Sequence, residues 1–158
     1  MKNQRKNRGF TLIEILVVIG IIAILATIVL IAINPARQFA QGRNTQRTSN
    51  ANTILNSVGQ RIADNKGIFS GSFTIGGTTY TCPSLPAAGS AVDIVTSGAV
   101  AGDIDLSCLT PTYVPSFPTD PTSAVGDDTG YDLEVDSAGR VTISAPSAEL
   151  GQIIEVTR

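Results

Sequence analysis

One acidic side chain, Glu14, stands beside the longest apolar stretch of the sequence. Residues 15–33 carry no charged side chain. An ionised carboxylate within a bilayer costs roughly 2.5–3.5 kcal/mol on insertion scales, so it needs a partner and suggests a function. A cut between Gly9 and Phe10 creates a partner, because it places a new α-amino group on Phe10, one helical turn before Glu14. That amine can pair with Glu14 of the same helix or of a neighbouring helix; otherwise the carboxylate reaches back to the membrane interface.

The two cysteines, Cys82 and Cys108, lie far beyond the apolar stretch. Two cysteines separated by a loop-rich segment predict one disulfide if the compartment is oxidising. Two free buried thiols are the alternative. A zinc site is disfavoured, because the sequence contains no His and two thiolates leave zinc short of ligands.

An acidic cluster, Asp127, Asp128 and Asp132, occurs in the segment GDDTGYD, with Asp120 nearby. Oxygen ligands in a Gly-rich loop can hold calcium, so these residues are weak calcium candidates. The spacing does not match an EF-hand, and a solvated acidic turn is the default interpretation. We therefore expect no cofactor, with calcium as the one exception to test.

Composition narrows the function classes further. The chain has 158 residues, enough for one modest domain and an anchor. The absence of His removes the commonest general base and argues against an enzyme. From residue 67 onward only Arg140 and Arg158 oppose eleven carboxylates, which makes nucleic acid an improbable direct ligand. Removal of residues 1–9 would take away four positive charges and shift the formal balance from −2 to −6.

The uncharged stretch is predicted to be a membrane-spanning helix. At about 1.5 Å per residue, residues 15–33 span roughly 28 Å, close to the hydrocarbon thickness of a bilayer. The basic segment before it, MKNQRKNRG, favours a cytoplasmic N-terminus. Neither a small-residue cleavage pattern nor a lipoprotein-type Cys follows the run, so we expect the helix to be retained.

A second helical segment is predicted over residues 35–66. Pro35 and Gly42 weaken the helix at its start. Residues 38–53 are too polar for lipid and favour a stem that contacts other subunits and the base of a head; a solvated linker is the alternative. A buried face then follows, formed by Ala51, Ile54, Leu55, Val58 and Ile62. The helix is expected to end at Asn65-Lys66-Gly67.

The remainder, residues 67–158, is predicted to be a loop-rich antiparallel β head. A hairpin is expected around Gly76-Gly77, and further strands around residues 131–135, 141–143 and 154–156. The proline-rich segment 83–128 is expected to be ordered mainly by loop packing and the suspected disulfide. Strands packed on one amphipathic helix predict the α+β class.

The N-terminal residues together resemble a known signature. Lys-Asn-Arg-Gly9, then Phe10-Thr11-Leu12-Ile13-Glu14, then the uncharged run is similar to the prepilin signature of type IV pilins and type II secretion pseudopilins. The motif covers about the first 25 residues, and the helical stem extends the likeness to near residue 65. The domain division that this predicts is a cleaved leader (1–9), an assembly helix (10–34), a stem (35–66) and a head (67–158).

The resemblance implies roles for particular residues and partners. A prepilin peptidase would cleave after Gly9, Phe10 would be N-methylated, and Glu14 would pair with a neighbour's N-terminus during assembly. The precursor would span the inner membrane once and then enter a homopolymer at the cell surface. A pilus for adhesion, motility or DNA uptake and a secretion pseudopilus share this N-terminus, and the presence of Glu14 favours a shaft subunit. Relatives carry a helix-unwinding Pro about one turn earlier than Pro35.

Two other functions compete with the filament subunit. A single-pass anchored binding module would keep its leader and tolerate Glu14→Val. An anchored enzyme is disfavoured, since the sequence holds no phosphate-binding Gly loop, metal-ligand cluster or nucleophile–base pair. The mass of the mature N-terminus separates these hypotheses.

Overall fold

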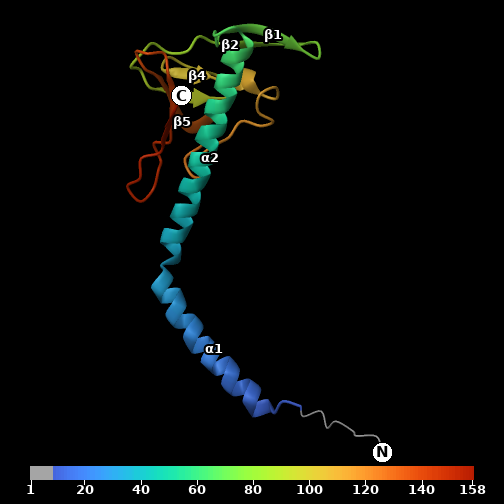
Figure 1. Cartoon of the computed structure of the whole chain (residues 1–158), viewed down its shortest axis with the longest axis vertical. Coiled ribbons are helices and arrows are strands. Elements are labelled where there is room, and N and C mark those ends of the chain that lie inside the picture. Colours follow the sequence, from blue (N-terminus) through green and yellow to red (C-terminus); the bar gives the residue numbers. More distant parts are fainter. Residues whose placement is uncertain (1–8) are drawn as a thin grey trace, which may run out of the picture. The chain divides into compact units, whose positions relative to one another are not determined.

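The computed structural model describes residues 9–158 and divides the chain into two compact units, one ending at Phe39 and the other spanning Ala40–Arg158. Residues 1–8, which carry the basic charges of the predicted leader, lie outside the described residues. The first unit is helical: α1 spans Leu12–Ile33, and α2 (Pro35–Asp64) begins there and continues into the second unit (Figure 1).

The break between the two helices falls at Asn34. This residue has a left-handed backbone (φ 48°), and Pro35 occupies the first position of α2. A proline disfavours the helical conformation in the residue before it, yet it suits a first helical position because its missing N–H needs no partner there. The weakening expected at Pro35 is therefore a complete interruption of the helix, one residue earlier.

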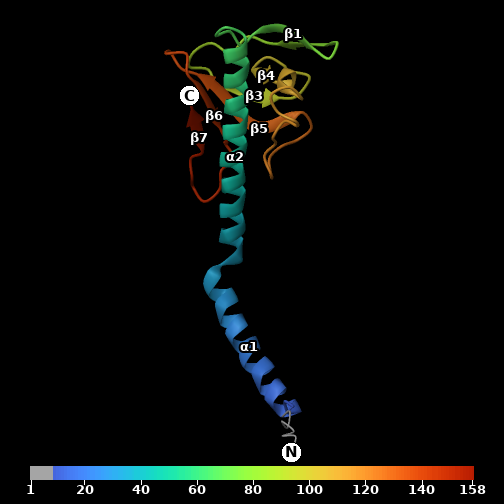
Figure 2. The ribbon, with the colours of Figure 1, turned by 45° about the vertical axis from the view of Figure 1, so that its right-hand side comes forward.

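The second unit is an α+β head built on one mixed sheet. Its strands are β1 (Gly71–Ile75), β2 (Thr78–Cys82), β3 (Val92–Val95), β4 (Asp103–Asp105), β5 (Asp128–Val135), β6 (Val141–Ser144) and β7 (Glu155–Thr157), with a short 3₁₀ helix, η1 (Ser107–Leu109). The main sheet has the order β4-β3-β5-β6-β7, and β1 and β2 form a separate hairpin. Figure 2 shows β6 and β7 beside α2.

The core of the head lies between α2 and the main sheet. Ala51, Ile54, Leu55 and Val58 of α2 are buried, as the helical spacing predicts, while Ile62 is half-buried. They pack in one cluster with the inward-facing residues of the sheet, Ile94, Leu133 and Ile143 among them. Alternate residues of a strand face opposite sides, so the polar residues between them lie on the outer face.

The sheet differs from the predicted one in two respects. β3 and β4 lie inside the segment 83–128, which was expected to be loop, and they pair in parallel rather than antiparallel. The prolines of that segment all fall outside residues 87–110, so each strand keeps its backbone donors. Ile94, Ile104 and Leu106 within this interval are buried in the core. The proline content was judged over the whole segment 83–128, so the two short strands in its proline-free part were not predicted.

Two turns were predicted at the right places. β1 and β2 pair antiparallel around Gly76 and Gly77, both with positive φ. α2 ends at Asp64, and Lys66 and Gly67 then take left-handed conformations. The Gly67 N–H donates to the Ile62 carbonyl (2.8 Å), which satisfies a helix-end acceptor.

Candidate functional site

The predicted processing segment lies at the start of α1. Gly9 and Phe10 precede the helix and are exposed, the Phe10 side chain by 85%. Thr11 is the N-cap residue, with an extended backbone. A peptide bond in exposed, non-helical chain is accessible to a peptidase, whereas a bond inside a helix is not, because its carbonyl and amide are hydrogen-bonded.

Glu14 is held by the cap of its own helix. The Thr11 N–H and the Thr11 Oγ1 hydroxyl both donate to Glu14 Oε2, at 2.8 and 2.9 Å. The Glu14 N–H donates in turn to Thr11 Oγ1 at 3.3 Å, which completes a capping box. The three bonds hold the carboxylate at the N-terminal end of α1, next to the Phe10–Thr11 backbone. Both donors reach the same oxygen, so Oε1 has no partner among the described residues.

The surface of α1 is apolar on every side. All of its residues, from Leu12 to Ile33, are exposed, and its 22 residues are long and apolar enough to cross a membrane. The Thr27 hydroxyl donates to the Ala23 carbonyl of the same helix at 2.8 Å, so its donor is satisfied within the helix. A helix that is hydrophobic all round requires lipid or other helices around it.

These features determine which ion pair the N-terminus could form after cleavage. Hydrolysis of the bond between Gly9 and Phe10 would leave an amine within one residue of the Thr11 N–H that already binds Glu14. The amine of the same chain or of a neighbour could therefore bind Glu14 Oε1, the carboxylate oxygen that accepts no hydrogen bond among the described residues. A charged pair of this kind is well suited to fixing the register between apolar helices.

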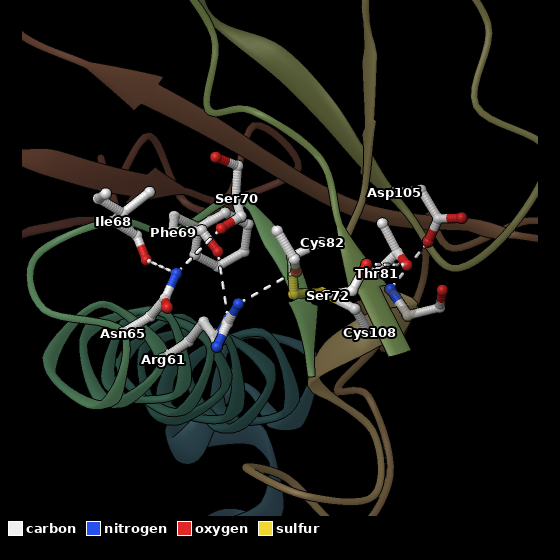
Figure 3. Close-up of a disulfide and its surroundings, with 12 residues drawn as sticks. Arg61, Asn65, Ile68, Phe69, Ser70, Ser72, Thr81, Cys82, Asp105 and Cys108 are labelled. Carbon is white, nitrogen blue, oxygen red and sulfur yellow. Dashed lines mark hydrogen bonds between the residues drawn. A yellow bond between two sulfur atoms is a disulfide. The ribbon is translucent and has the colours of Figure 1, made fainter. Parts of the chain in front are cut away.

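In the head, Cys82 and Cys108 form a disulfide. It joins the end of β2 to η1, with the two Cα atoms 5.3 Å apart, and closes a loop over a sequence separation of 26 (Figure 3). Arg61 of α2 binds the same region, donating to the Phe69 carbonyl at 3.2 Å and the Gly71 carbonyl at 3.1 Å. The β1–β2 hairpin is thus attached to the head from both sides.

Replacing both cysteines with Ser is expected to lower the free energy of unfolding by about 2–4 kcal/mol, because the loop between them regains freedom in the unfolded chain. Urea unfolding of the detergent-solubilised chain, followed by circular dichroism, measures the loss. Reductant should destabilise the unsubstituted chain by a similar amount and leave the double variant unchanged. Equal stability of both chains under oxidising conditions would contradict a stabilising role.

A second cluster, which sequence reasoning missed, surrounds Arg47 of α2. The Arg47 side chain is fully buried and binds Asp120, itself buried, through Nε–Oδ2 (2.6 Å) and Nη2–Oδ1 (3.2 Å). Its Nη2 also donates to Thr122 Oγ1 (2.7 Å), and its Nη1 donates to Glu149 Oε2 (2.9 Å). One guanidinium therefore joins α2 to two separate loops of the head.

Arg43 and Asn44 complete the attachment of the second loop. Arg43 binds Glu149 in a bidentate pair, Nε–Oε2 at 2.7 Å and Nη2–Oε1 at 2.6 Å. Asn44 donates to the Glu149 carbonyl and accepts from the Glu149 N–H, at 2.8 and 3.0 Å. The polar half of α2, expected to serve as a stem, is thus also a docking surface for the head's own loops.

The cluster keeps both of its carboxylates ionised. The bonds from Arg43 and then Arg47 lower the pKa of Glu149 to about 2. Burial opposes ionisation of Asp120, but the Arg47 bond and the Thr122 and Ser123 backbone N–H groups outweigh it and hold its pKa well below the usual range. The negative charges are therefore matched within the fold.

The predicted acidic cluster is only partly assembled. Asp127 lies on the turn before β5, and Asp128 and Asp132 lie on β5. Asp132 is paired across the strands with Asp93 of β3. Asp120, which was grouped with these residues by sequence proximity, instead binds Arg47. In residues 9–158 no group of three or more His, Cys, Asp or Glu side chains is arranged to hold a metal ion.

Burial, followed by the nearby Asp93 carboxylate, raises the pKa of Asp132 to about 6, from an unfolded value near 3.8. The folded head then keeps a proton that the unfolded chain loses, so the free energy of unfolding is expected to fall as pH rises from about 4 to 6. Asp132→Asn should remove this slope and raise stability at pH 7 by about 1 kcal/mol. Thermal melts across this range measure it. Asp127→Asn, at an exposed position, is the control, and an unchanged slope in Asp132→Asn would contradict the assignment.

Comparison with known proteins identifies the N-terminal segment. Residues 4–30 match the family model described as the prokaryotic N-terminal methylation motif, the leader signature of type IV pilin and pseudopilin precursors. The match covers Gly9, Phe10 and Glu14 together with most of α1. No curated protein and no solved structure matches the chain.

Proposed function

We propose that the chain is the precursor of a structural subunit of a type IV pilus-like filament. A prepilin peptidase cleaves it between Gly9 and Phe10, Phe10 is N-methylated, and α1 passes from the inner membrane into a homopolymer at the cell surface. The methylation motif over residues 4–30 supports the processing steps. The motif belongs to a structural class of protein, and the proposal assigns the chain no catalysis of its own.

The proposal rests mainly on the surroundings of the Glu14 carboxylate. Its carboxylate lies at the start of a helix whose other residues are exposed and, apart from Thr27, carry no polar side chain, and its only hydrogen bonds among the described residues come from Thr11. Such a group is costly in lipid unless a cation meets it. Cleavage supplies one cation per subunit, so the number of amines equals the number of carboxylates in any polymer of the mature chain.

The mass of the mature N-terminus tests the proposal directly. Intact-mass and fragment spectra of the chain from sheared surface material should show loss of residues 1–9 and addition of one methyl group on Phe10. A Gly9→Arg variant, whose scissile bond is altered, should keep its leader and remain in the membrane fraction. A surface-exposed chain that begins at Met1 would overturn the proposal in favour of a simple membrane anchor.

The chain is proposed to be a shaft subunit of a surface pilus, with a secretion pseudopilus as the alternative filament. The carboxylate at Glu14 favours a shaft subunit, because a tip subunit has no neighbour beyond it to supply an amine. Electron microscopy of cells with and without the gene distinguishes the two. Long surface filaments that disappear with the chain indicate a pilus, and a secretion defect without filaments indicates a pseudopilus.

Calcium binding by Asp127, Asp128 and Asp132 stays a weaker proposal. Calcium would relieve the repulsion between Asp132 and Asp93, so binding should raise the melting temperature of the detergent-solubilised chain and lower the pKa of Asp132. A melt series in calcium, with magnesium and an Asp132→Asn variant as controls, measures the shift. An unchanged melting temperature in millimolar calcium would remove the idea.

A further inference from the structure

An apolar groove lies on the head between α2 and the edge of the main sheet. It is lined by Leu55, Val58, Gly59 and Ile62 of α2, with Val141 and Arg158 on the opposite side, and its volume is about 230 Å³. Sites for drug-sized ligands usually measure roughly 300–1,000 Å³. The groove is therefore better matched to a single aliphatic side chain than to a small molecule.

A loop elsewhere on the same head presents such a side chain. In the 149–153 loop, Ile153 is 84% exposed and Leu150 is 49% exposed, with a left-handed backbone at Leu150 (φ 60°). The loop is not loosely attached, because Asn44 binds the backbone of Glu149 on both sides and the Gln152 side chain at 2.7 Å. The fold thus holds two apolar side chains of one loop, Leu150 and Ile153, exposed on an anchored backbone, where a contact with apolar surface would remove them from water.

The charges at the two places are opposite. Of the two basic residues from residue 67 onward, Arg158 lines the groove. Arg140 is not among the lining residues and is paired with Asp136 through Nε–Oδ2 at 2.7 Å. The Arg158 guanidinium donates to the neutral Asn56 Oδ1 at 2.6 Å. Beside the loop, Glu155 is exposed and lines the same hollow as Ile153. An apolar knob, the Ile153 side chain, with an acidic neighbour therefore matches an apolar groove that has one basic residue, Arg158, in its lining.

The knob and the groove lie at different heights along α2. The loop is bonded to Asn44, whereas the groove begins at Leu55 and ends at Ile62. At about 1.5 Å per residue, this separation is roughly 16–27 Å along the helix. Two complementary patches at separate places on one molecule give a head-to-tail contact that leaves a free knob at one end and a free groove at the other. Such contacts extend into open chains.

We propose that Ile153 of one copy of this chain docks into the groove of the next copy, with Glu155 facing Arg158. The inference rests on the proposed function, because it names the contact between heads in the proposed homopolymer. It adds a second set of subunit contacts, outside the apolar helix and independent of Glu14. The occupant of the groove is a second copy and not the loop of the same head, which is held at Asn44.

Cysteine cross-linking tests the contact. Gly59 lines the groove, and a Cβ there meets no atom within 4 Å, so Gly59→Cys should fold normally. In cells expressing the chain with both Gly59→Cys and Ile153→Cys, mild oxidation should give a ladder of covalent multimers. Either single substitution should give at least about tenfold less cross-linked product. Gly59→Cys combined with Val125→Cys, a 76% exposed residue on the turn before β5, is the matched control.

The outcomes separate this contact from the proposed function. A ladder from the 59/153 pair alone supports the contact. Absence of the ladder while filaments still form overturns the contact and leaves the filament role standing. If the unsubstituted chain forms no filament, the proposed function fails, and the same oxidation of the chain in membranes still decides the contact by the presence or absence of the ladder. Cross-linking of the single Ile153→Cys chain to itself would overturn the proposal in favour of a symmetric dimer.

A charge substitution at Ile153 tests the contact independently. Ile153→Asp changes an exposed side chain, so it should leave the melting temperature unchanged and reduce the length or number of filaments at least about tenfold. Ile75→Asp, at an exposed apolar position of the β1–β2 hairpin, is the control and should leave filaments intact. Normal filaments in Ile153→Asp would count against the contact.

Discussion

Cells that carry Glu14→Gln are expected to process the chain normally and to lack filaments. The amide keeps the size and the hydrogen-bonding capacity of the side chain, and it removes the negative charge that would meet the Phe10 amine. Breaking one partner of a buried ion pair costs roughly 3–5 kcal/mol, which corresponds to more than about a hundredfold in the equilibrium constant for adding a subunit. Filament yield after shearing, measured by immunoblot and electron microscopy, reports the loss.

The comparison variant for this prediction is Thr27→Val. Thr27 is also a polar residue within α1, and its hydroxyl is satisfied by the Ala23 carbonyl of the same helix, so its removal should leave filament yield near that of the unsubstituted chain. The level of processed chain in the membrane must match in all strains, because a degraded variant also yields no filaments. Wild-type filament yield from Glu14→Gln would show that charge pairing at this position is dispensable.

The N-terminal half of the architecture could be predicted because its signals are local. An uncharged run bounded by Glu14 and Pro35 sets the extent of α1 almost residue by residue. The buried face of α2 from Ala51 to Val58 follows from helical spacing alone, and the Gly76-Gly77 turn positions its hairpin. In each case the residues that carry the signal are close in sequence, so no knowledge of the rest of the fold is required.

The Arg47 cluster could not be predicted in the same way, because its partners lie 73 and 102 residues away along the chain. One signal was available. Ala40, Asn44, Arg47 and Ala51 continue the helical spacing of the buried face upstream, although none of the four has a large apolar side chain. A polar residue at a core position suggests a buried partner. Asp120 is that partner, but its position in the sequence groups it with the acidic segment GDDTGYD.

The two short strands β3 and β4 escaped prediction for a related reason. Each is four residues or fewer, and their burial depends on packing against strands that come later in the chain. Periodicity over so few residues is not distinguishable from chance. Asp93 of β3 was consequently not placed beside Asp132.

Replacing Arg47 with Met is expected to destabilise the head strongly. Met fills part of the volume, but Asp120 is then a buried carboxylate without its cation, and Thr122 loses a donor. Removing one partner of a buried pair typically costs 3–5 kcal/mol, which for a head of this size lowers the melting temperature on the order of 10 °C. Thermal unfolding of the detergent-solubilised chain measures the change.

Arg43→Met is the matched control, because the same residue type is lost one turn earlier from a pair that is about one-third exposed. The Arg43–Glu149 pair should be worth about 1 kcal/mol or less. Asp120→Asn added to Arg47→Met should recover part of the loss, since the neutral amide no longer requires a cation and still accepts from the Thr122 N–H. A melting temperature for Arg47→Met equal to that of Arg43→Met would contradict the buried-pair account.

The dependence of the free energy of unfolding on pH, on the acidic side, gives a second test of the Arg47 cluster. Asp120 and Glu149 have lower pKa values in the folded head than in the unfolded chain, so the stability they add is complete above about pH 4.5 and is lost as pH falls towards 2. Without the Arg47 guanidinium the pKa of Asp120 rises, because only the Thr122 and Ser123 bonds then oppose its burial. The pKa of Glu149 rises less, because its bonds from Arg43 remain. The Arg47→Met chain should therefore lose less stability between pH 4.5 and 2 than the unsubstituted chain. An identical acid slope in the two chains would place the source of the acid sensitivity elsewhere in the fold.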